Sequence, residues 1–382
     1  MVKLHYKIDY WESRSLDLLK KATTPFGIKA SCTATTNYSS VFSRDAVMAG
    51  IAGLVYDDGE ILNGLRATIE MFHITKGKQG QIASNFKMLN EEVEHISFGT
   101  LSPKYDSATW YLVAIGLLLE KGFDYGLEYV ESTILLLDAL EYNGYDLIYI
   151  PQGGNWADEY PYEGYVLYDQ VLRSWGLRLL GKHFKKAEWT RKADSIKAKI
   201  DSKYFNSNTG YYNCTFSPSG INHTFDFAAH NLLGIYDCNL DNSDFNKSLD
   251  WIEENFLSNE ILPGAFFPII DKEHPQWELI SNFHLFDFKN KPHHYHNGGI
   301  WFIWIGWYAL VLRKNKRLKA LDQLADISFG LLNEMNDFNF DEYITGDSNE
   351  PNGTQELCYT ATGILFLCAA LKQKDNIIDL FL

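Results

Sequence analysis

The chain has 382 residues, 46% of them hydrophobic, and is long enough to bury a large core. Its formal net charge of −15 argues against binding to nucleic acid or to an anionic membrane, because both need clustered lysine and arginine. We expect no signal peptide at the start, and the apolar runs are too short or too interrupted to span a bilayer. The five cysteines show no CxxC spacing, which favours reduced thiols and a cytoplasmic location.

Apolar residues recur at helical spacing in about a dozen stretches. In chain order, the predicted helices span residues 10–23, 44–54, 61–73, 107–120, 126–142, 165–183, 186–204, 225–235, 246–257, 299–313, 318–335 and 356–372. Short strands are expected only in loops such as 145–150. A dozen paired helices with long, aromatic loops predicts an all-α fold, an (α/α)6 toroid whose inner helices are the more apolar and whose long loops gather at one end. Because no Pro/Ser-rich linker divides the chain, we expect one domain over residues 1–382.

Aromatic residues make up 15% of the chain and cluster in segments that contain glycine. Rings beside acids and amides suit a sugar pocket, because the apolar face of a pyranose stacks on a ring while its hydroxyls need fixed donors and acceptors. The same clusters could instead be satellite cores under long loops. Four segments combine turn formers, aromatics and ionisable groups, and we expect them to form the rim of one pocket: 37–45, 153–160, 294–301 and 338–356.

Two acids in these segments are candidates for glycoside hydrolysis, which needs a protonated and an ionised carboxyl group. Asp158 lies between Trp156 and Tyr160, and burial against these rings would raise its pKa, as a general acid requires. Glu342, between Asp341 and Tyr343, is the candidate for the ionised partner. The alternatives are a helix cap for Asp158 and a solvated turn for Glu342.

Further side chains are candidates for substrate binding. Tyr38, Phe42, Trp156 and Trp301 could stack against a sugar or belong to the loop core. Asp106 and Trp110, one helical turn apart, could both face the pocket, although helix capping explains Asp106 equally well. The histidines lack HxxxH or HExxH spacing, so we predict no metal site. His296 and Asn297 are expected to bind substrate hydroxyls or to shape their loop.

These segments resemble those of the (α/α)6 glycosidases that include neutral and alkaline invertases, glucosidase-I-like enzymes and the glucosidase domain of glycogen debranching enzymes. The matching motifs are Phe42-Ser43-Arg44-Asp45, Trp156-Ala157-Asp158, Tyr295-His296-Asn297-Gly298-Gly299-Ile300-Trp301 and Phe340-Asp341-Glu342-Tyr343. The resemblance covers residues from about 38 to 371. It implies cleavage of an α-glycosidic bond with inversion, without metal or cofactor.

The resemblance also implies individual roles. Asp45, beside Arg44, would hold sugar hydroxyls, Asp158 would be the general acid, and Glu342 would be the second catalytic carboxylate. The chain departs from the invertase pattern in having no arginine shortly after Gly353, which leaves sucrose specificity open. Glu356 competes for the role of the base, and its simpler interpretation is a first-turn acid favoured by the helix dipole.

The expected function is therefore an inverting α-glycosidase, with an α-glucosidic bond as the favoured target, acting on a small oligosaccharide or glucoside. Inversion predicts that the two carboxyl groups lie roughly 6.5–9.5 Å apart. One alternative is a sugar epimerase or isomerase that depends on His230 or His296, and another is a carbohydrate-binding protein without catalysis. The sugar, the linkage and the oligomeric state stay open, and the apolar end of the chain, residues 377–382, could dock on its own domain or on a partner.

Overall fold

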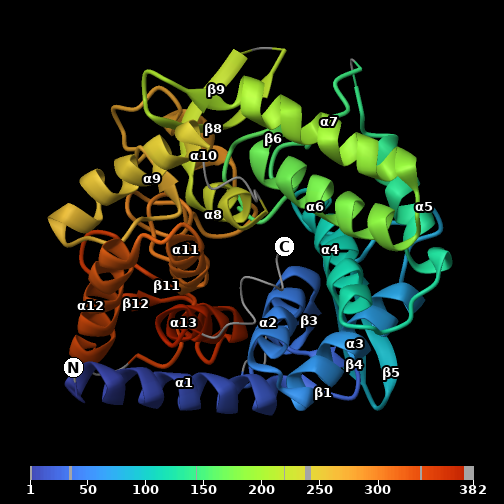
Figure 1. Cartoon of the computed structure of the whole chain (residues 1–382), viewed down its shortest axis with the longest axis horizontal. Helices are drawn as coiled ribbons and strands as arrows, with labels where there is room; N and C mark the ends of the chain where they lie inside the picture. Colours follow the sequence, from blue (N-terminus) through green and yellow to red (C-terminus); the bar gives the residue numbers. More distant parts are fainter. Residues whose placement is uncertain are drawn as a thin grey trace.

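Twelve long helices form two concentric rings in the computed structural model, which describes residues 2–33, 37–142, 144–218, 220–236, 242–335 and 338–373. The inner ring consists of α2 (Ser43–Tyr56), α4 (Asp106–Glu120), α6 (Leu167–His183), α8 (Phe227–Tyr236), α11 (Phe302–Lys314) and α13 (Cys358–Leu371). The outer ring consists of α1 (Val2–Ala22), α3 (Gly59–Ile74), α5 (Leu127–Asp138), α7 (Ala187–Lys203), α9 (Ser243–Asn255) and α12 (Leu318–Glu334). Each inner helix packs against the next, and α13 closes the ring on α2 (Figure 1). The prediction of an (α/α)6 toroid is confirmed.

The inner helices are more completely buried than the outer helices, in agreement with the prediction that the inner helices are the more apolar. Every residue of α13 from 358 to 370 is buried, because this helix has neighbours on all sides. In α12, buried residues recur every three or four positions, as in Leu321, Leu324, Ser328 and Leu332, so that only one face meets the core. Two inner helices cross closely, since a Cβ atom built on Gly306 of α11 would lie 2.1 Å from the carbonyl oxygen of Gly363 in α13.

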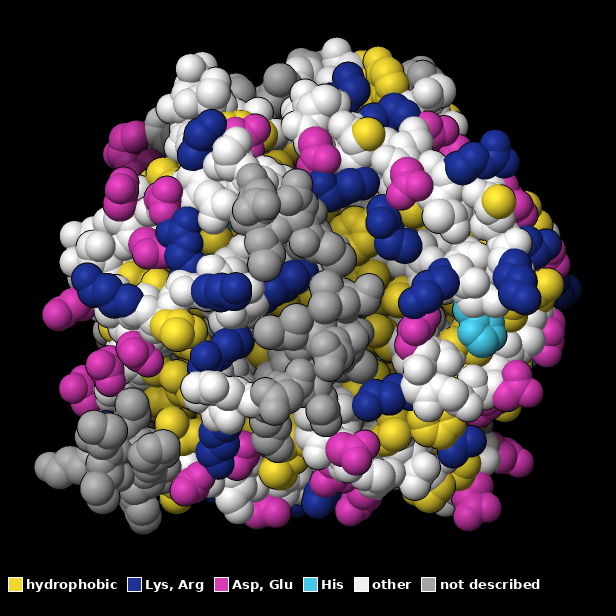
Figure 2. Space-filling view, viewed as in Figure 1, with side chains coloured by type: hydrophobic (Ala, Val, Ile, Leu, Met, Phe, Trp, Pro, Cys, Tyr) yellow, Lys and Arg dark blue, Asp and Glu magenta, His cyan; other side chains and the backbone are white. Residues whose placement is uncertain are grey.

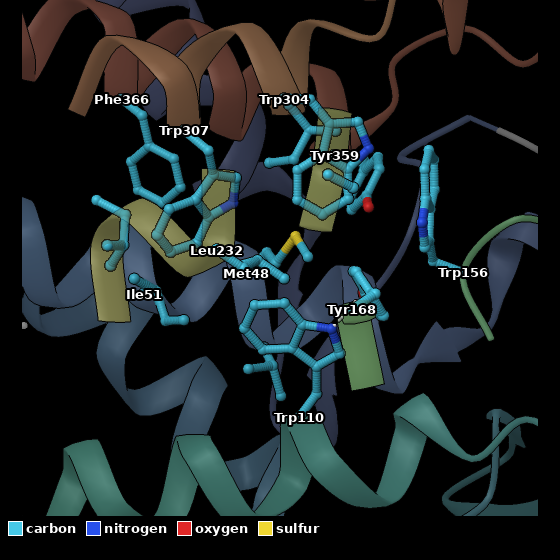
Figure 3. Close-up of a cluster of buried hydrophobic side chains, with 14 of the residues drawn as sticks. Met48, Ile51, Trp110, Trp156, Tyr168, Leu232, Trp304, Trp307, Tyr359 and Phe366 are labelled. Atoms are coloured by element: carbon cyan, nitrogen blue, oxygen red, sulfur yellow. Dashed lines mark hydrogen bonds between the residues drawn. The ribbon is translucent and has the colours of Figure 1, made fainter. Parts of the chain in front are cut away.

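The centre of the toroid is filled with large side chains from all six inner helices (Figure 3). They include Met48 and Ile51 of α2, Trp110 of α4, Tyr168 of α6, Leu232 of α8, Trp304 and Trp307 of α11, and Tyr359 and Phe366 of α13. The Trp110 indole donates a 2.7 Å hydrogen bond to the Tyr168 hydroxyl, which satisfies a polar group that would otherwise be unpaired in the core. The ring is therefore a packed core and not an open channel.

Short helices and strands in the loops complete the fold. The remaining helices are α10 (Trp277–Asn282) and the 3-10 turns η1 (Asn37–Ser39) and η2 (Leu257–Asn259). One sheet has the order β3-β4-β5, formed by Val41–Phe42, Asn85–Leu89 and Glu92–Ser97. A second sheet has the order β10-β9-β8-β6, with β7 also paired to β8, and comprises Phe266–Phe267, Gly220–Asp226, Tyr211–Ser217, Tyr165–Val166 and Phe205–Asn206. Two small antiparallel pairs are β1 with β2 (Thr23–Thr24, Gly27–Ile28) and β11 with β12 (Tyr343–Ile344, Pro351–Asn352).

The loops differ from expectation in two places. The hairpins β4–β5 and β8–β9 are not among the predicted elements. Strand β5 is almost wholly exposed, whereas β8 packs against α6 and α9. The strand expected within 145–150 is absent, and this described segment forms only isolated bridges, such as the one between Ile150 and Gly164.

Charges of both signs are mixed on the surface. On the face shown in Figure 2, Lys and Arg side chains are interspersed with Asp and Glu side chains. Among the residues that the structure describes, no helix is both long enough and apolar enough to cross a membrane. Cys32, Cys214, Cys358 and Cys368 are free thiols. Cys238 and the apolar segment 377–382 lie outside the described residues.

Candidate active site

A narrow chamber lies where the loops before α2, α11 and α13 meet the loop that carries Asp158. This inner chamber, of about 40 Å³, is lined by Tyr38, Phe42, Arg44, Asp45, Trp156, Asp158, Tyr295, His296, Trp301, Glu342, Leu357 and Tyr359. It draws on all four segments that the sequence singles out. Six of its lining residues also line an adjoining outer cavity of about 530 Å³: Tyr38, Phe42, Arg44, Asp45, Asp158 and Tyr295.

Glu342 is placed by the small hairpin β11–β12, which begins at the next residue. Its side chain is buried, the Tyr38 hydroxyl donates to Oε1 at 2.6 Å, and the Thr354 amide donates to Oε2 at 3.2 Å. Burial raises the pKa of Glu342 above its ordinary value, although these two hydrogen bonds lower it in part. The neighbouring Asp341 has a different task, because its carboxylate accepts from the Asn339 amide at 2.9 Å and braces the loop.

Asp158 lies on the wall shared by the inner chamber and the outer cavity, and its side chain is 41% exposed. Lys104, from the loop before α4, forms an ion pair with its carboxylate and also donates to the carbonyl oxygens of Gly153 (2.7 Å) and Asn155 (3.0 Å). Partial removal from water raises the pKa of the Asp158 carboxyl group, but the positive charges of Lys104 and Arg44 lower it by more. The net result is a pKa below the ordinary value. The expectation of a raised pKa is wrong for this state of the site, because Lys104 is distant in sequence and nothing local indicates the pair.

Three loops of the site are tied together by hydrogen bonds. The buried Asn290 side chain donates to the backbone carbonyl of Glu159 at 2.8 Å and accepts from the amide of His296 at 3.1 Å. Ile300 and Ile344 exchange backbone hydrogen bonds of 2.7 and 2.9 Å. The segments that carry Asp158, His296 and Glu342 therefore form one connected wall, and the negative charge of Asp158 raises the pKa of Glu342.

The first turn of α2 supplies two further charged groups of the chamber, Arg44 and Asp45. Arg44 donates from Nη1 to the Asp106 carboxylate at 2.7 Å, which fixes the guanidinium at the chamber. Asp45 is 7% exposed, and burial raises its pKa to about 6 even though the nearby Arg44 opposes this. A carboxyl group at this depth is suited to holding sugar hydroxyls.

Aromatic rings form the remaining walls. Trp156 stacks on Phe266 with a centroid separation of 5.6 Å, and Trp301 stacks on His296 at 5.0 Å with nearly parallel rings. His296 is buried, and neither ring nitrogen has a hydrogen-bond partner within the described part of the chain. Burial holds the pKa of His296 well below its ordinary value, so the imidazole is neutral and has one donor and one acceptor for a ligand.

Four predicted site residues do not line the chamber. Asp106 lies behind Arg44 as its buried partner, since it is the first residue of α4. Trp110 lies in the central core, because its position one turn further along α4 points it toward Trp307 and Tyr168.

The other two of these four residues lie in the loops. Asn297 is fully buried and braces the loop through hydrogen bonds with the backbone of Ile270, both of 2.8 Å. Glu356 has φ +49°, precedes α13 and forms a 3.0 Å ion pair with Lys21 of α1, so it does not compete with Glu342 inside the chamber. His230, the other histidine considered for catalysis, packs on Phe245 in the core at 4.7 Å.

The sequence interpretation missed several residues of the site. Tyr295 belongs to the Tyr-His-Asn-Gly-Gly motif and could have been included on that signal. Tyr359 lies in the first turn of a helix with no polar face, and Lys104 and Asn290 act only through loops distant in sequence, so no local pattern marks them. In the described ranges, no group of three or more His, Cys, Asp or Glu side chains is arranged to hold a metal ion.

Known proteins share both the sequence pattern and the fold of this chain. A family model for alkaline and neutral invertases matches residues 181–373, about half of the chain. No curated protein sequence matches the chain. Among solved structures, a family 63 mannosylglycerate hydrolase from Thermus thermophilus, in complex with glucose, is similar with a TM-score of 0.65 and 11% sequence identity. The similarity covers 93% of this chain and 99% of the hydrolase.

Two further structures have the same ring of helices. A bacterial glucoamylase complexed with acarbose has a TM-score of 0.61 and 12% identity, over 97% of this chain and 57% of the glucoamylase. A rhamnosidase from Klebsiella oxytoca with bound rhamnose has a TM-score of 0.59 and 9% identity, over 92% of this chain and 63% of the rhamnosidase. At these identities the likeness concerns the fold.

Proposed function

Because the chain belongs to the alkaline and neutral invertase family of glycoside hydrolases, we propose that it cleaves an α-glucosidic bond of a small oligosaccharide or glucoside with inversion. The observation that carries this proposal is the meeting of Asp158 and Glu342, from distant parts of the chain, on the wall of one small chamber. We also propose that the whole chain acts as one catalytic domain, and that its free thiols reflect a cytoplasmic location.

In the proposed reaction the sugar that is cleaved lies where the outer cavity joins the inner chamber, because the inner chamber alone, of about 40 Å³, is too small for a hexose ring. Asp45 and the neutral His296 bind its hydroxyls, while Trp156 and Trp301 present ring surfaces to its apolar faces. Asp158 gives its proton to the glycosidic oxygen as the bond from that oxygen to C1 breaks. Glu342 takes a proton from a water molecule that attacks C1 from the opposite face, which inverts the anomeric configuration.

The two carboxyl groups have unequal surroundings, and this bears on their roles. Glu342 accepts hydrogen bonds at both oxygens and is ready to act as a base once it is ionised. Asp158 must hold a proton when the bond breaks, and its pairing with Lys104 opposes this. We therefore propose that Lys104 leaves the Asp158 carboxylate when the leaving group of the substrate binds.

Amide variants of the two acids test the roles separately. Asp158→Asn should lower kcat on α-glucosides by about 10²- to 10⁴-fold. The same variant should keep more of its activity on α-glucosyl fluoride, because fluoride departs without protonation. Glu342→Gln should lose activity on both substrates, since neither can be hydrolysed without an activated water. Glu356→Gln is the matched control and should behave as wild type.

Product analysis completes the test. Hydrolysis of a panel of α-glucosides, including sucrose, trehalose, kojibiose and isomaltose, followed by NMR, should show β-glucose as the first product. Formation of α-glucose would exclude inversion, and wild-type rates for both amide variants would exclude these two residues as the catalytic pair.

A further inference from the structure

The outer cavity has features of its own that bear on the leaving group. This inference rests on the proposed function: if Asp158 protonates the glycosidic oxygen, the leaving group must lie beyond Asp158, and that space is the outer cavity. The outer cavity has a volume of about 530 Å³, more than ten times that of the inner chamber. This volume is enough for a second sugar ring.

The rim of the outer cavity presents an aromatic surface. Phe286 lines the cavity and is 74% exposed, although contact of a large apolar ring with water is unfavourable. Leu101, also on this wall, is 37% exposed, and Ser84, Ser97 and Thr100 line the same cavity. An exposed ring beside hydroxyl groups matches the apolar face and the polar edge of a sugar.

The positive charges on the walls are not equivalent. Arg44 is paired with Asp106, and Lys104 is paired with Asp158. Lys289 has no ion pair with any residue that the structure describes, and its ammonium group lies 5.2 Å from the ring centroid of Tyr295. It is therefore the cation of the outer cavity that has no ion pair within the described ranges, and it lies beside Tyr295, which lines both cavities. Its charge also lowers the pKa of Glu342, so its replacement is judged by the ratio between matched substrates.

We propose that the outer cavity binds a sugar leaving group that carries an anionic substituent, a phosphate or a carboxylate, with Lys289 contacting the anion and Phe286 stacking on the ring. An ammonium group pairs well with either anion. Three acids line the same cavity. Asp158 is neutralised by its ion pair with Lys104, and Asp45 also lines the inner chamber. Glu159 accepts from the Leu285 amide at 3.3 Å.

An anionic leaving group would also act on the catalytic acid. An anion bound at Lys289 adds negative charge to the cavity that Asp158 also lines, and nearby negative charge raises the pKa of a carboxyl group. Binding of the substrate would then favour the protonated form of Asp158 that the reaction needs. A neutral leaving group could not produce this effect. The charge of the leaving group would therefore account both for the preference for anionic substrates and for the protonation of Asp158.

Matched substrates test the proposal. Sucrose and trehalose are compared with sucrose 6′-phosphate, trehalose 6-phosphate and the uronic acid of trehalose, which carry the charge on the leaving sugar. We expect kcat/KM for at least one anionic substrate to exceed that of its neutral parent by about tenfold or more. In Lys289→Met this ratio should fall about tenfold or more, and in Lys289→Arg it should be largely kept. Lys319→Met, on the exposed side of α12, is the control and should leave the ratio unchanged.

A binding measurement keeps the two proposals separable. Calorimetry with glucose 6-phosphate and glucose on the intact protein should show tighter binding of the phosphate, weakened by Lys289→Met and by added salt. Equal kcat/KM for neutral and anionic substrates, or an unchanged ratio in Lys289→Met, overturns the anion site while the glycosidase remains. Failure to cleave any α-glycoside overturns the proposed function, and the calorimetry still decides whether the outer cavity binds an anionic sugar.

Discussion

Gly353→Ala tests the role of Glu342 without replacing it. The carboxylate is kept, but the added methyl group pushes it out of position. Gly353 follows β12 and has φ +82°. A Cβ atom built there would lie 2.5 Å from Oε2 and 2.6 Å from Cβ of Glu342. Carbon contacts are normally about 3.5–4.0 Å, so the Glu342 side chain must retreat by roughly 1 Å. A displacement of this size at a catalytic group costs about 10²-fold in rate.

The substitution also strains the backbone, and a second glycine separates the two effects. Gly122 has φ +87° and nothing within 4 Å of an added methyl group, so Gly122→Ala carries the same strain of about 1–2 kcal/mol without a new contact. Thermal unfolding and kcat/KM on the best α-glucoside are measured for both variants. We expect Gly353→Ala to lose more stability than Gly122→Ala, because it also displaces the buried Glu342, and we expect a large loss of kcat/KM in Gly353→Ala alone. Equal kcat/KM in the two variants would refute the placement of the base at Glu342.

Three further predictions concern titration. Tyr38→Phe removes a hydrogen bond to the buried Glu342, worth about 1.5–3 kcal/mol, so the pKa of Glu342 should rise and the acidic limb of the kcat/KM profile should move to higher pH; an unmoved limb contradicts the role of the base. Lys104→Met removes the partner of Asp158, so the basic limb should also move to higher pH, because the acid keeps its proton longer. The folded pKa of Asp45, about 6, lies above its ordinary 3.8, so its contribution to stability is full below pH 3.8 and is lost as the pH rises through 6. Asp45→Asn should remove this difference of about 3 kcal/mol, as measured by denaturant unfolding of both proteins across that range.

Helices were predictable here because their signal is local. The sequence shows apolar residues every three or four positions in α12 and a nearly uninterrupted apolar run in α13. Both patterns are visible without knowing what packs against the helices. Helix ends were less predictable. The segment 126–142 forms a helix only as far as Asp138, and α1 begins eight residues before the predicted start. Such ends depend on capping and on contacts with neighbouring loops, which periodicity does not contain.

The chamber was predictable in part. Asp158, Glu342, Asp45 and His296 stand in loops rich in glycine and aromatics, and such loops are where ring-shaped folds carry ligands. The prediction that Trp110 and Asp106 face the chamber was wrong. One helical turn separates them, yet their direction along α4 decides between pocket, ion pair and core. That direction follows from how α4 is rotated against α2 and α6.

The amino-acid order alone determined the helices of the two rings, their pairing into a toroid and the segments that contain the acids, because these follow from periodicity and from residue chemistry along the chain. The contacts of the two acids depended on closure of the ring. It brought Lys104 to Asp158 and Tyr38 to Glu342, groups that are 54 and 304 positions apart, and so it set the proton affinities of both acids. Charge interactions depend on distance in space, and distance in space becomes defined only when the first and last inner helices meet.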